Sequence, residues 1–125
     1  MKFTRIALSI WPMLGALLGA PASAAGDAKH GKAVFVRCAA CHTLETGKNR
    51  IGPSLAKVVG RKAGTAAGFA YSPALKAYGK VWDARLLDAF LAAPTKVLPG
   101  TRMVMAVADP KDRADLIAYL RTASK

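Results

Sequence analysis

Five consecutive residues, Cys38-Ala39-Ala40-Cys41-His42, constrain this chain more than any other feature of its sequence. Two thiols lie one helical turn apart, and a histidine follows the second thiol directly. This spacing is the attachment signature of c-type haem. The thiols can bond to two vinyl groups of one porphyrin, and the histidine can become the proximal ligand of the iron.

Three other uses of the cysteines stay open at this point. A thioredoxin-like dithiol requires a βαβ context, and no parallel-strand pattern surrounds the motif. A structural zinc site requires four ligands, whereas His30 lies at the wrong spacing before the only two cysteines. A disulfide between Cys38 and Cys41 leaves His42 without a role. Haem attachment is the interpretation that uses all three side chains of the motif.

Residues 1–25 have the pattern of a secretory signal peptide. The basic Lys2 and Arg5 precede an apolar run over 6–20, and small residues follow over 21–25. The apolar run of about 15 residues is short against the ~20 that a membrane span requires. We therefore expect export, with an uncleaved membrane anchor as the alternative.

Cleavage is expected after Ala24 or Ala25, which leaves residues 26–125 as one mature domain. Attachment of haem to reduced thiols outside the cytoplasm fits the bacterial periplasm. A domain of this size has a modest core, so a large apolar cofactor that binds the native state would add to its stability.

The chain is strongly basic. It has 19 basic and 7 acidic residues, and the predicted signal takes only two of the basic ones. Such an excess steers a small domain toward acidic surfaces. Exported proteins rarely meet nucleic acid, so acidic protein partners or an anionic membrane face are expected instead.

Four helices and no strands are predicted from apolar periodicity and capping residues. Gly31 inside the first helix costs ~1 kcal/mol of helix propensity, which indicates close approach of another helix. His30 beside it is expected to be exposed to solvent, and the third helix is expected to end at Pro94. The four helices begin at Asp27, Ser72-Pro73, Asp83 and Asp109-Pro110.

Long loops between the helices supply candidate ligands. Glycines interrupt the segment 58–71, which predicts an Ω-like loop. A proximal histidine usually donates its other ring N–H to a carbonyl, and Pro53 offers a carbonyl without an N–H of its own. Met103 and Met105 are the only thioethers of the mature chain that could fill the sixth iron position. The rigid Pro-Gly-Thr loop before Met103 favours that residue.

Taken together, these stretches resemble class I cytochromes c, in particular the bacterial members close to mitochondrial cytochrome c. The resemblance implies that 26–125 is a cytochrome c domain with an all-α fold, in which about four helices and long loops wrap around one haem. It implies that the first and last helices cross, with Gly31 and Phe35 meeting Leu116 and Tyr119. The matching stretches are 26–42, 59–64, 68–72, Trp82, 99–103 and 115–120.

The resemblance also implies the site. One haem c would be attached covalently through Cys38 and Cys41, with its iron bound by His42 and Met103 and with the Pro53 carbonyl on His42. Buried haem propionates need polar partners. Those partners would be Arg61, Tyr71, Trp82 and Thr101.

Three positions depart from the family pattern. Phe90 stands where a tyrosine is frequent, Leu75 stands where an asparagine is frequent, and Met105 replaces an aromatic residue at the haem edge. They predict a more apolar environment on the methionine side of the haem. They also leave Met105 open as a substitute ligand.

The implied function is outer-sphere transfer of single electrons between respiratory or photosynthetic complexes, with no enzyme activity and no small-molecule substrate. Expected partners are acidic surfaces of redox proteins: a cytochrome reductase complex, and a terminal oxidase, a reaction centre or a periplasmic dehydrogenase. Service to one dedicated dehydrogenase is the alternative. Two rival functions have less support. This sequence shows no distal histidine, which a haem peroxidase would need, and no βαβ context, which a thiol–disulfide oxidoreductase would need. Docking is expected to use basic residues that orient the partner, namely Lys32, Arg37, Lys48, Arg50, Lys96 and Arg102.

Overall fold

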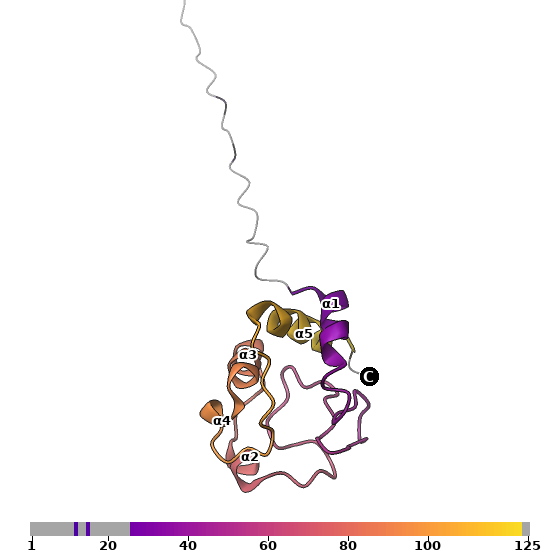
Figure 1. The fold of residues 1–125 in the computed structure, drawn as a ribbon, viewed down its shortest axis with the longest axis vertical. Coiled ribbons are helices and arrows are strands. Elements are labelled where there is room, and N and C mark those ends of the chain that lie inside the picture. The colour runs from indigo at the N-terminus through magenta and orange to yellow at the C-terminus, as the bar shows by residue number, and fades with distance from the viewer. Residues whose placement is uncertain (1–11, 13–14, 16–25, 124–125) are drawn as a thin grey trace, which may run out of the picture.

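The computed structural model describes residues 12, 15 and 26–123, so the predicted signal peptide and its cleavage site lie outside the described domain. Loops and helices enclose the interior of that domain (Figure 1). One isolated antiparallel bridge, Lys62 to Val81, is the β pairing found among these residues. In the same residues, no helix combines the length and hydrophobicity of a membrane span. The helices are α1 (Ala28–Phe35), α2 (Pro73–Ala77), α3 (Ala84–Ala92), α4 (Pro94–Val97) and α5 (Pro110–Ala123).

The predicted helix starts are confirmed by their caps. The Asp27 carboxylate accepts the N–H of Lys29 at 2.9 Å, the Ser72 hydroxyl accepts the N–H of Leu75 at 3.2 Å, and the Asp83 carboxylate accepts the N–H of Leu86 at 2.7 Å. Each side chain satisfies a backbone donor that the first helical turn leaves without a partner.

The prediction of four helices was wrong by one short element. Pro94 was expected to end the third helix, but α3 ends at Ala92 and Pro94 begins α4. Proline fits a first helical position because its fixed φ suits the helix and its missing N–H is not needed there. A helix of four residues is too short to show a periodic apolar stripe, so the sequence pattern did not reveal it.

The first and last helices, α1 and α5, cross as predicted (Figure 1). The crossing depends on Gly31. A Cβ at this position would overlap the backbone carbonyl of Asp115 in α5. Beside it, the rings of Phe35 and Tyr119 lie with their centroids 5.5 Å apart. The ~1 kcal/mol propensity cost of the glycine therefore permits direct packing of backbone on backbone.

A buried carboxylate reinforces this crossing. The side chain of Asp115 is 3% exposed, and its oxygens accept the N–H of Asp27 at 2.7 Å, the ring N–H of His30 at 2.7 Å and the ammonium of Lys111 at 2.6 Å. These donors, with Lys111 the largest contributor, lower the pKa of Asp115 from 3.8 to about 2. His30 was expected to be exposed. Its side chain is 44% exposed, but its ring binds the buried carboxylate.

The core lies where α1, α3 and α5 meet. Leu116 of α5 and Val107 of the preceding loop are each 1% exposed, and Val34 of α1 is 4% exposed. Full burial of such a side chain contributes roughly 1.5–3 kcal/mol. Several residues of this core also face an internal cavity, so the helices that stabilise the fold also form the walls of the site.

Candidate functional site

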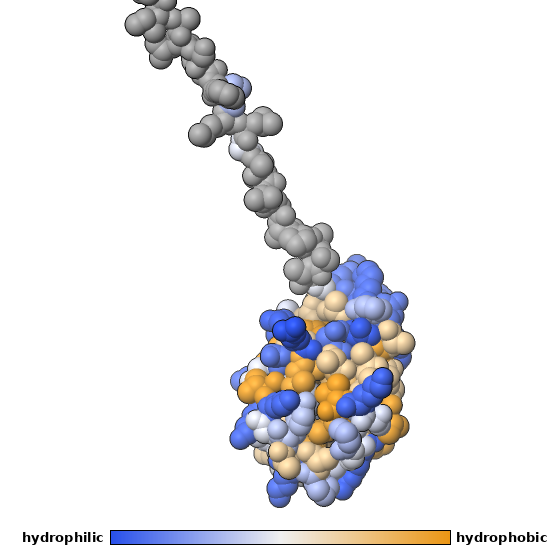
Figure 2. All heavy atoms as spheres, turned by 90° about the vertical axis from the view of Figure 1, so that its left-hand side faces the viewer, coloured by the Kyte–Doolittle hydropathy of each residue, from blue (hydrophilic) through white to orange (hydrophobic). Residues whose placement is uncertain are grey.

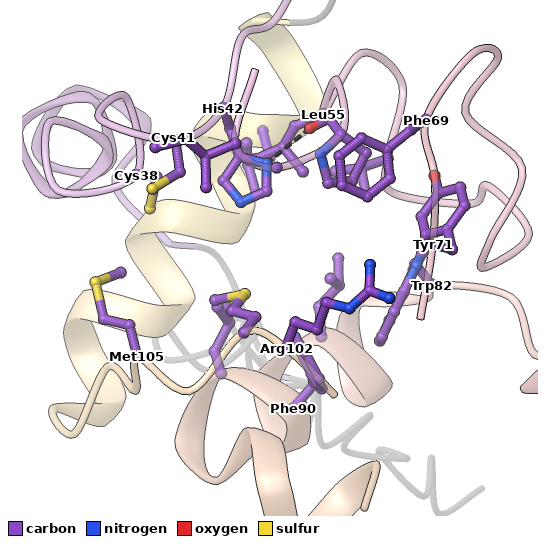
Figure 3. A pocket seen from close by; sticks show the side chains of 18 of the residues that line it. Cys38, Cys41, His42, Leu55, Phe69, Tyr71, Trp82, Phe90, Arg102 and Met105 are labelled. Carbon is purple, nitrogen blue, oxygen red and sulfur yellow. Dashed lines mark hydrogen bonds between the residues drawn. The ribbon is translucent and has the colours of Figure 1, made fainter. Parts of the chain in front are cut away.

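A cavity of about 480 Å³ occupies the centre of the domain. Figure 3 shows His42 above it, Phe90 below it, the two cysteines at one end, and Tyr71 and Trp82 at the other end. Most of the lining is apolar, so a ligand that fills the cavity must be largely apolar too. The apolar wall includes Leu55, Val58, Leu87, Phe90, Leu91, Leu116 and Leu120.

The imidazole of His42 is held in one orientation. Its Nδ1 lies 2.7 Å from the carbonyl oxygen of Pro53, and because a carbonyl only accepts, Nδ1 carries the proton. Burial lowers the pKa of His42, Arg61 lowers it further, and the Pro53 carbonyl partly opposes this. A Cβ at Gly52 would overlap the ring, so glycine is needed beside it. The result is a neutral imidazole whose Nε2 lone pair is available to a metal.

The thiols of Cys38 and Cys41 reach the cavity from a turn that continues beyond α1. The N–H of Cys41 and the N–H of His42 both donate to the carbonyl of Cys38, at 3.0 and 2.9 Å. No disulfide joins these two cysteines, both of which belong to the described residues. Burial raises the pKa of Cys38 despite the nearby Arg37, so this thiol lacks the thiolate character of a disulfide-exchange enzyme.

Met103 lines the cavity and is partly buried, whereas Met105 is 41% exposed and lies at the end near the cysteines (Figure 3). The hydroxyl of Thr101 accepts the N–H of Met103 at 3.3 Å, which shapes the backbone before the thioether. Phe90 also lines the cavity, as its place on the methionine side predicts, but Leu75 packs against the core outside the lining. Of the three positions expected to depart from the family pattern, Phe90 and Met105 therefore line the cavity and Leu75 does not.

The far end of the cavity offers polar donors. Nη1 of Arg61 donates to the carbonyl of Ala56 at 2.8 Å, while its buried Nε has no hydrogen-bond partner among the described residues. Burial lowers the pKa of Arg61, with Tyr71 opposing the shift. The hydroxyl of Tyr71 accepts the N–H of Ala66 at 2.9 Å and keeps its own proton to donate. Buried donors of this kind call for a partner, and an acidic group of a bound ligand would supply one.

The predicted haem-binding residues therefore converge, with one exception. Eight of them line the cavity, whereas Thr101 lies outside the lining and bonds to the loop backbone instead. Sequence reasoning did not single out Phe69, Ile51 or Val104, which also line the cavity. Phe69 belongs to the matching stretch 68–72, which could have pointed to it. Ile51 and Val104 carried no such signal, because they are exposed apolar residues in loops. The eight residues that line the cavity are Cys38, Cys41, His42, Pro53, Arg61, Tyr71, Trp82 and Met103.

The predicted docking residues separate into two groups. Arg37 and Arg102 line the cavity, and Lys32, Lys48, Arg50 and Lys96 lie outside its lining. Arg37 binds the Asp112 carboxylate at 2.9 Å and Arg102 donates to the carbonyl of Ala70 at 3.2 Å. Elsewhere, Lys48 pairs with Glu45 and Arg50 donates to the carbonyl of Ala39. Figure 2 shows a face on which apolar surface is bordered by hydrophilic side chains.

The fold is all-α and surrounds an apolar cavity. This cavity brings together two thiols, a neutral imidazole, a thioether and unpaired polar donors. Such a fold and such a site define a c-type haem protein. The donor set fits haem c, whose large apolar ring and acidic side groups match the wall and the far end of the cavity. The cytochrome c family model matches residues 28–124, and the chain belongs to this family.

Similar proteins agree with this assignment. Cytochrome c2 of Rhodomicrobium vannielii is 46% identical over 126 residues, which cover 98% of this chain and 97% of that protein. Cytochrome c of Arabidopsis thaliana is 46% identical over 103 residues, covering 80% and 92%. The structure of cytochrome cH from Methylobacterium extorquens is 49% identical with a TM-score of 0.73, covering 78% of this chain and 99% of that one.

These findings confirm the predicted family and the predicted fold. The protein is a monohaem c-type cytochrome with covalently attached haem c, and it carries electrons to and from redox protein partners. Cytochromes c that carry electrons are generally not enzymes.

Proposed function

We propose that residues 26–125 act in the periplasm as a single-electron carrier, with haem c joined to Cys38 and Cys41 and its iron bound by His42 and Met103. When bound, the haem supplies an iron that alternates between two oxidation states. The hydrogen bond from His42 to Pro53 carries the proposal, because it fixes the Nδ1 proton and leaves Nε2 for the iron (Figure 3). The methionine thioether suits a low-spin carrier because it raises the reduction potential.

The wall of the cavity has two tasks in this proposal. Its apolar side chains would exclude water from the haem, and an iron held by both His42 and Met103 would have no free position for a substrate. Arg61, Tyr71 and Trp82 would bind the propionates at the far end, where the unpaired Nε of Arg61 supports the role. Thr101 would bind a propionate as well, because its hydroxyl accepts the N–H of Met103 and keeps its own proton to donate.

The mouth of the cavity would be the docking face. Ile51, Val104 and Met105 are 80%, 71% and 41% exposed there, and Arg37 and Arg102 lie beside them. Apolar contact surrounded by positive charge suits an acidic redox partner, because charge orients the encounter more than it strengthens the complex. The partners would be a reductase complex and an oxidase, reaction centre or dehydrogenase. A single dedicated dehydrogenase and an uncleaved membrane anchor stay as alternatives.

Protein from a host competent in cytochrome maturation tests this function. We expect an intact mass equal to the chain cleaved after Ala24 or Ala25 plus one haem, and a sulfur-to-iron charge-transfer band in the oxidised protein. After denaturation, neither cysteine should react with an alkylating reagent. Colourless protein with two reactive thiols would contradict the proposal, and a mass that includes residues 1–25 would favour the anchored form.

A further inference from the structure

Two thioethers face one cavity in this protein. Met103 and Met105 are separated by a single residue, and both contribute to the lining that also contains His42. Only one of them can occupy the sixth position of the iron at a time. The function proposed above assigns that position to Met103 and gives Met105 only a place on the docking face.

The backbone around Met105 is held at both ends but not in between. Before it, the N–H of Met103 donates to the hydroxyl of Thr101 at 3.3 Å. After it, the N–H of Val107 donates to the carbonyl of Leu91 at 2.8 Å, and Val107 is 1% exposed. Within the described chain, the backbone groups of the three residues 104–106 have no hydrogen-bond partner.

This segment can therefore move at low cost. Its side chains are exposed, with Val104 at 71% and Met105 at 41%. A segment with few buried contacts and no backbone hydrogen bonds belongs to the least stable part of a fold. Displacing it breaks no hydrogen bond and leaves the anchor at Val107 in place.

The chemistry of the two side chains is the same. A methionine side chain is unbranched and has three rotatable bonds, so it adapts to different geometries. An iron that accepts the sulfur of Met103 will accept that of Met105, and the difference between the two bound states lies in the rearrangement of the loop. Met105 also lies at the edge of the same cavity rather than on a distant surface (Figure 3).

We propose that Met105 is a second sulfur ligand for the same iron, which takes the sixth position when Met103 is lost or displaced. The inference rests on the proposed ligation by His42 and Met103. Its consequence is that the cavity stays closed to small external ligands even when the first thioether leaves.

Four haem-loaded proteins test the proposal: wild type, Met103→Leu, Met105→Leu and the double variant. We expect Met103→Leu to keep a sulfur-to-iron charge-transfer band in the oxidised state, and the double variant to lose it. In the reduced state, an internal ligand that is bound ~90% of the time weakens the apparent affinity for carbon monoxide about tenfold. Met103→Leu should therefore bind carbon monoxide at least about tenfold more weakly than the double variant.

Equal spectra and equal carbon monoxide affinities for Met103→Leu and the double variant would overturn the proposal. Met105→Leu serves as the matched control and keeps the wild-type band. If the wild type itself lacks the band, the proposed ligation by Met103 fails, which is a separate result. Should Met103→Leu fail to fold, Met103→Ala with and without Met105→Leu gives the same comparison without a branched side chain in the cavity.

Discussion

The backbone N–H of Asp27 donates to Oδ1 of Asp115 at 2.7 Å, a contact that joins the start of α1 to α5 across 88 residues of sequence. His30 and Lys111 bind the other oxygen of the same carboxylate. The two ends of the domain therefore meet on a single ionised group.

The first prediction concerns the stability of the fold in acid. The pKa of Asp115 is about 2 in the folded protein, below its ordinary value of 3.8. A lowered pKa means that the unfolded state binds the proton more readily, so this group stabilises the fold fully above its ordinary pKa. That stability is lost as the pH falls from about 4 through about 2. Chemical unfolding of wild type and Asp115→Asn across this range measures the effect.

Asp115→Asn should lower the stability at neutral pH and flatten its decline in acid. Asp88→Asn is a suitable control, because the Asp88 side chain is 49% exposed and its ion pair within the described domain is with Arg113. Parallel acid profiles for wild type and Asp115→Asn would contradict the role of the buried carboxylate.

The second prediction concerns the helix crossing at Gly31. Helix propensity alone predicts that Gly31→Ala stabilises the protein by about 1 kcal/mol. The overlap of a Cβ with the Asp115 carbonyl predicts the opposite, a loss of about 1–3 kcal/mol from overpacking. Denaturant unfolding gives the sign, and a stabilised variant would show that the helices have room to separate.

The third prediction concerns the orientation of His42. A Cβ in Gly52→Ala would overlap the imidazole, so we expect a shifted ring, an altered haem spectrum and a stability loss of about 1–3 kcal/mol. Pro53→Ala keeps the carbonyl that accepts the Nδ1 proton and should leave the spectrum close to wild type. Spectra and thermal unfolding of both haem-loaded variants make the comparison. Equal effects of the two changes would argue against the glycine contact.

The fourth prediction concerns docking. Electron transfer to a partner should slow as salt is added, because charges are screened beyond ~10 Å at 0.1 M salt. At low salt, Arg37→Gln and Arg102→Gln should each slow transfer severalfold, since both guanidinium groups lie at the cavity. Lys48→Gln should have less effect because Lys48 lies outside the cavity lining. Stopped-flow rates that change neither with salt nor in any of the three variants would contradict docking at the mouth of the cavity.

Much of the site could be predicted because it is local in sequence. The spacing of Cys38, Cys41 and His42 determines which groups share one turn, and Pro53 follows closely enough to supply the carbonyl. Helix starts were also predictable, since a cap such as Asp27 acts on the N–H groups that directly follow it.

The features that could not be predicted depend on contacts between distant residues. Nothing in the sequence near His30 indicates that its ring reaches Asp115, because that contact exists only after α1 and α5 have packed. The single turn of α4 was too short for any periodic signal.

The packing of α1 on α5 also sets an order of events in biosynthesis. Domains usually begin to fold from the N-terminus as the chain emerges, but here the first helix finds its partner only in the last 14-residue helix. The packing of α1 on α5 can therefore form only after α5 has reached the compartment that already holds α1. In an exported chain, the cysteines that follow α1 would thus arrive before the helix that completes the core, and they would be accessible for haem attachment during that interval.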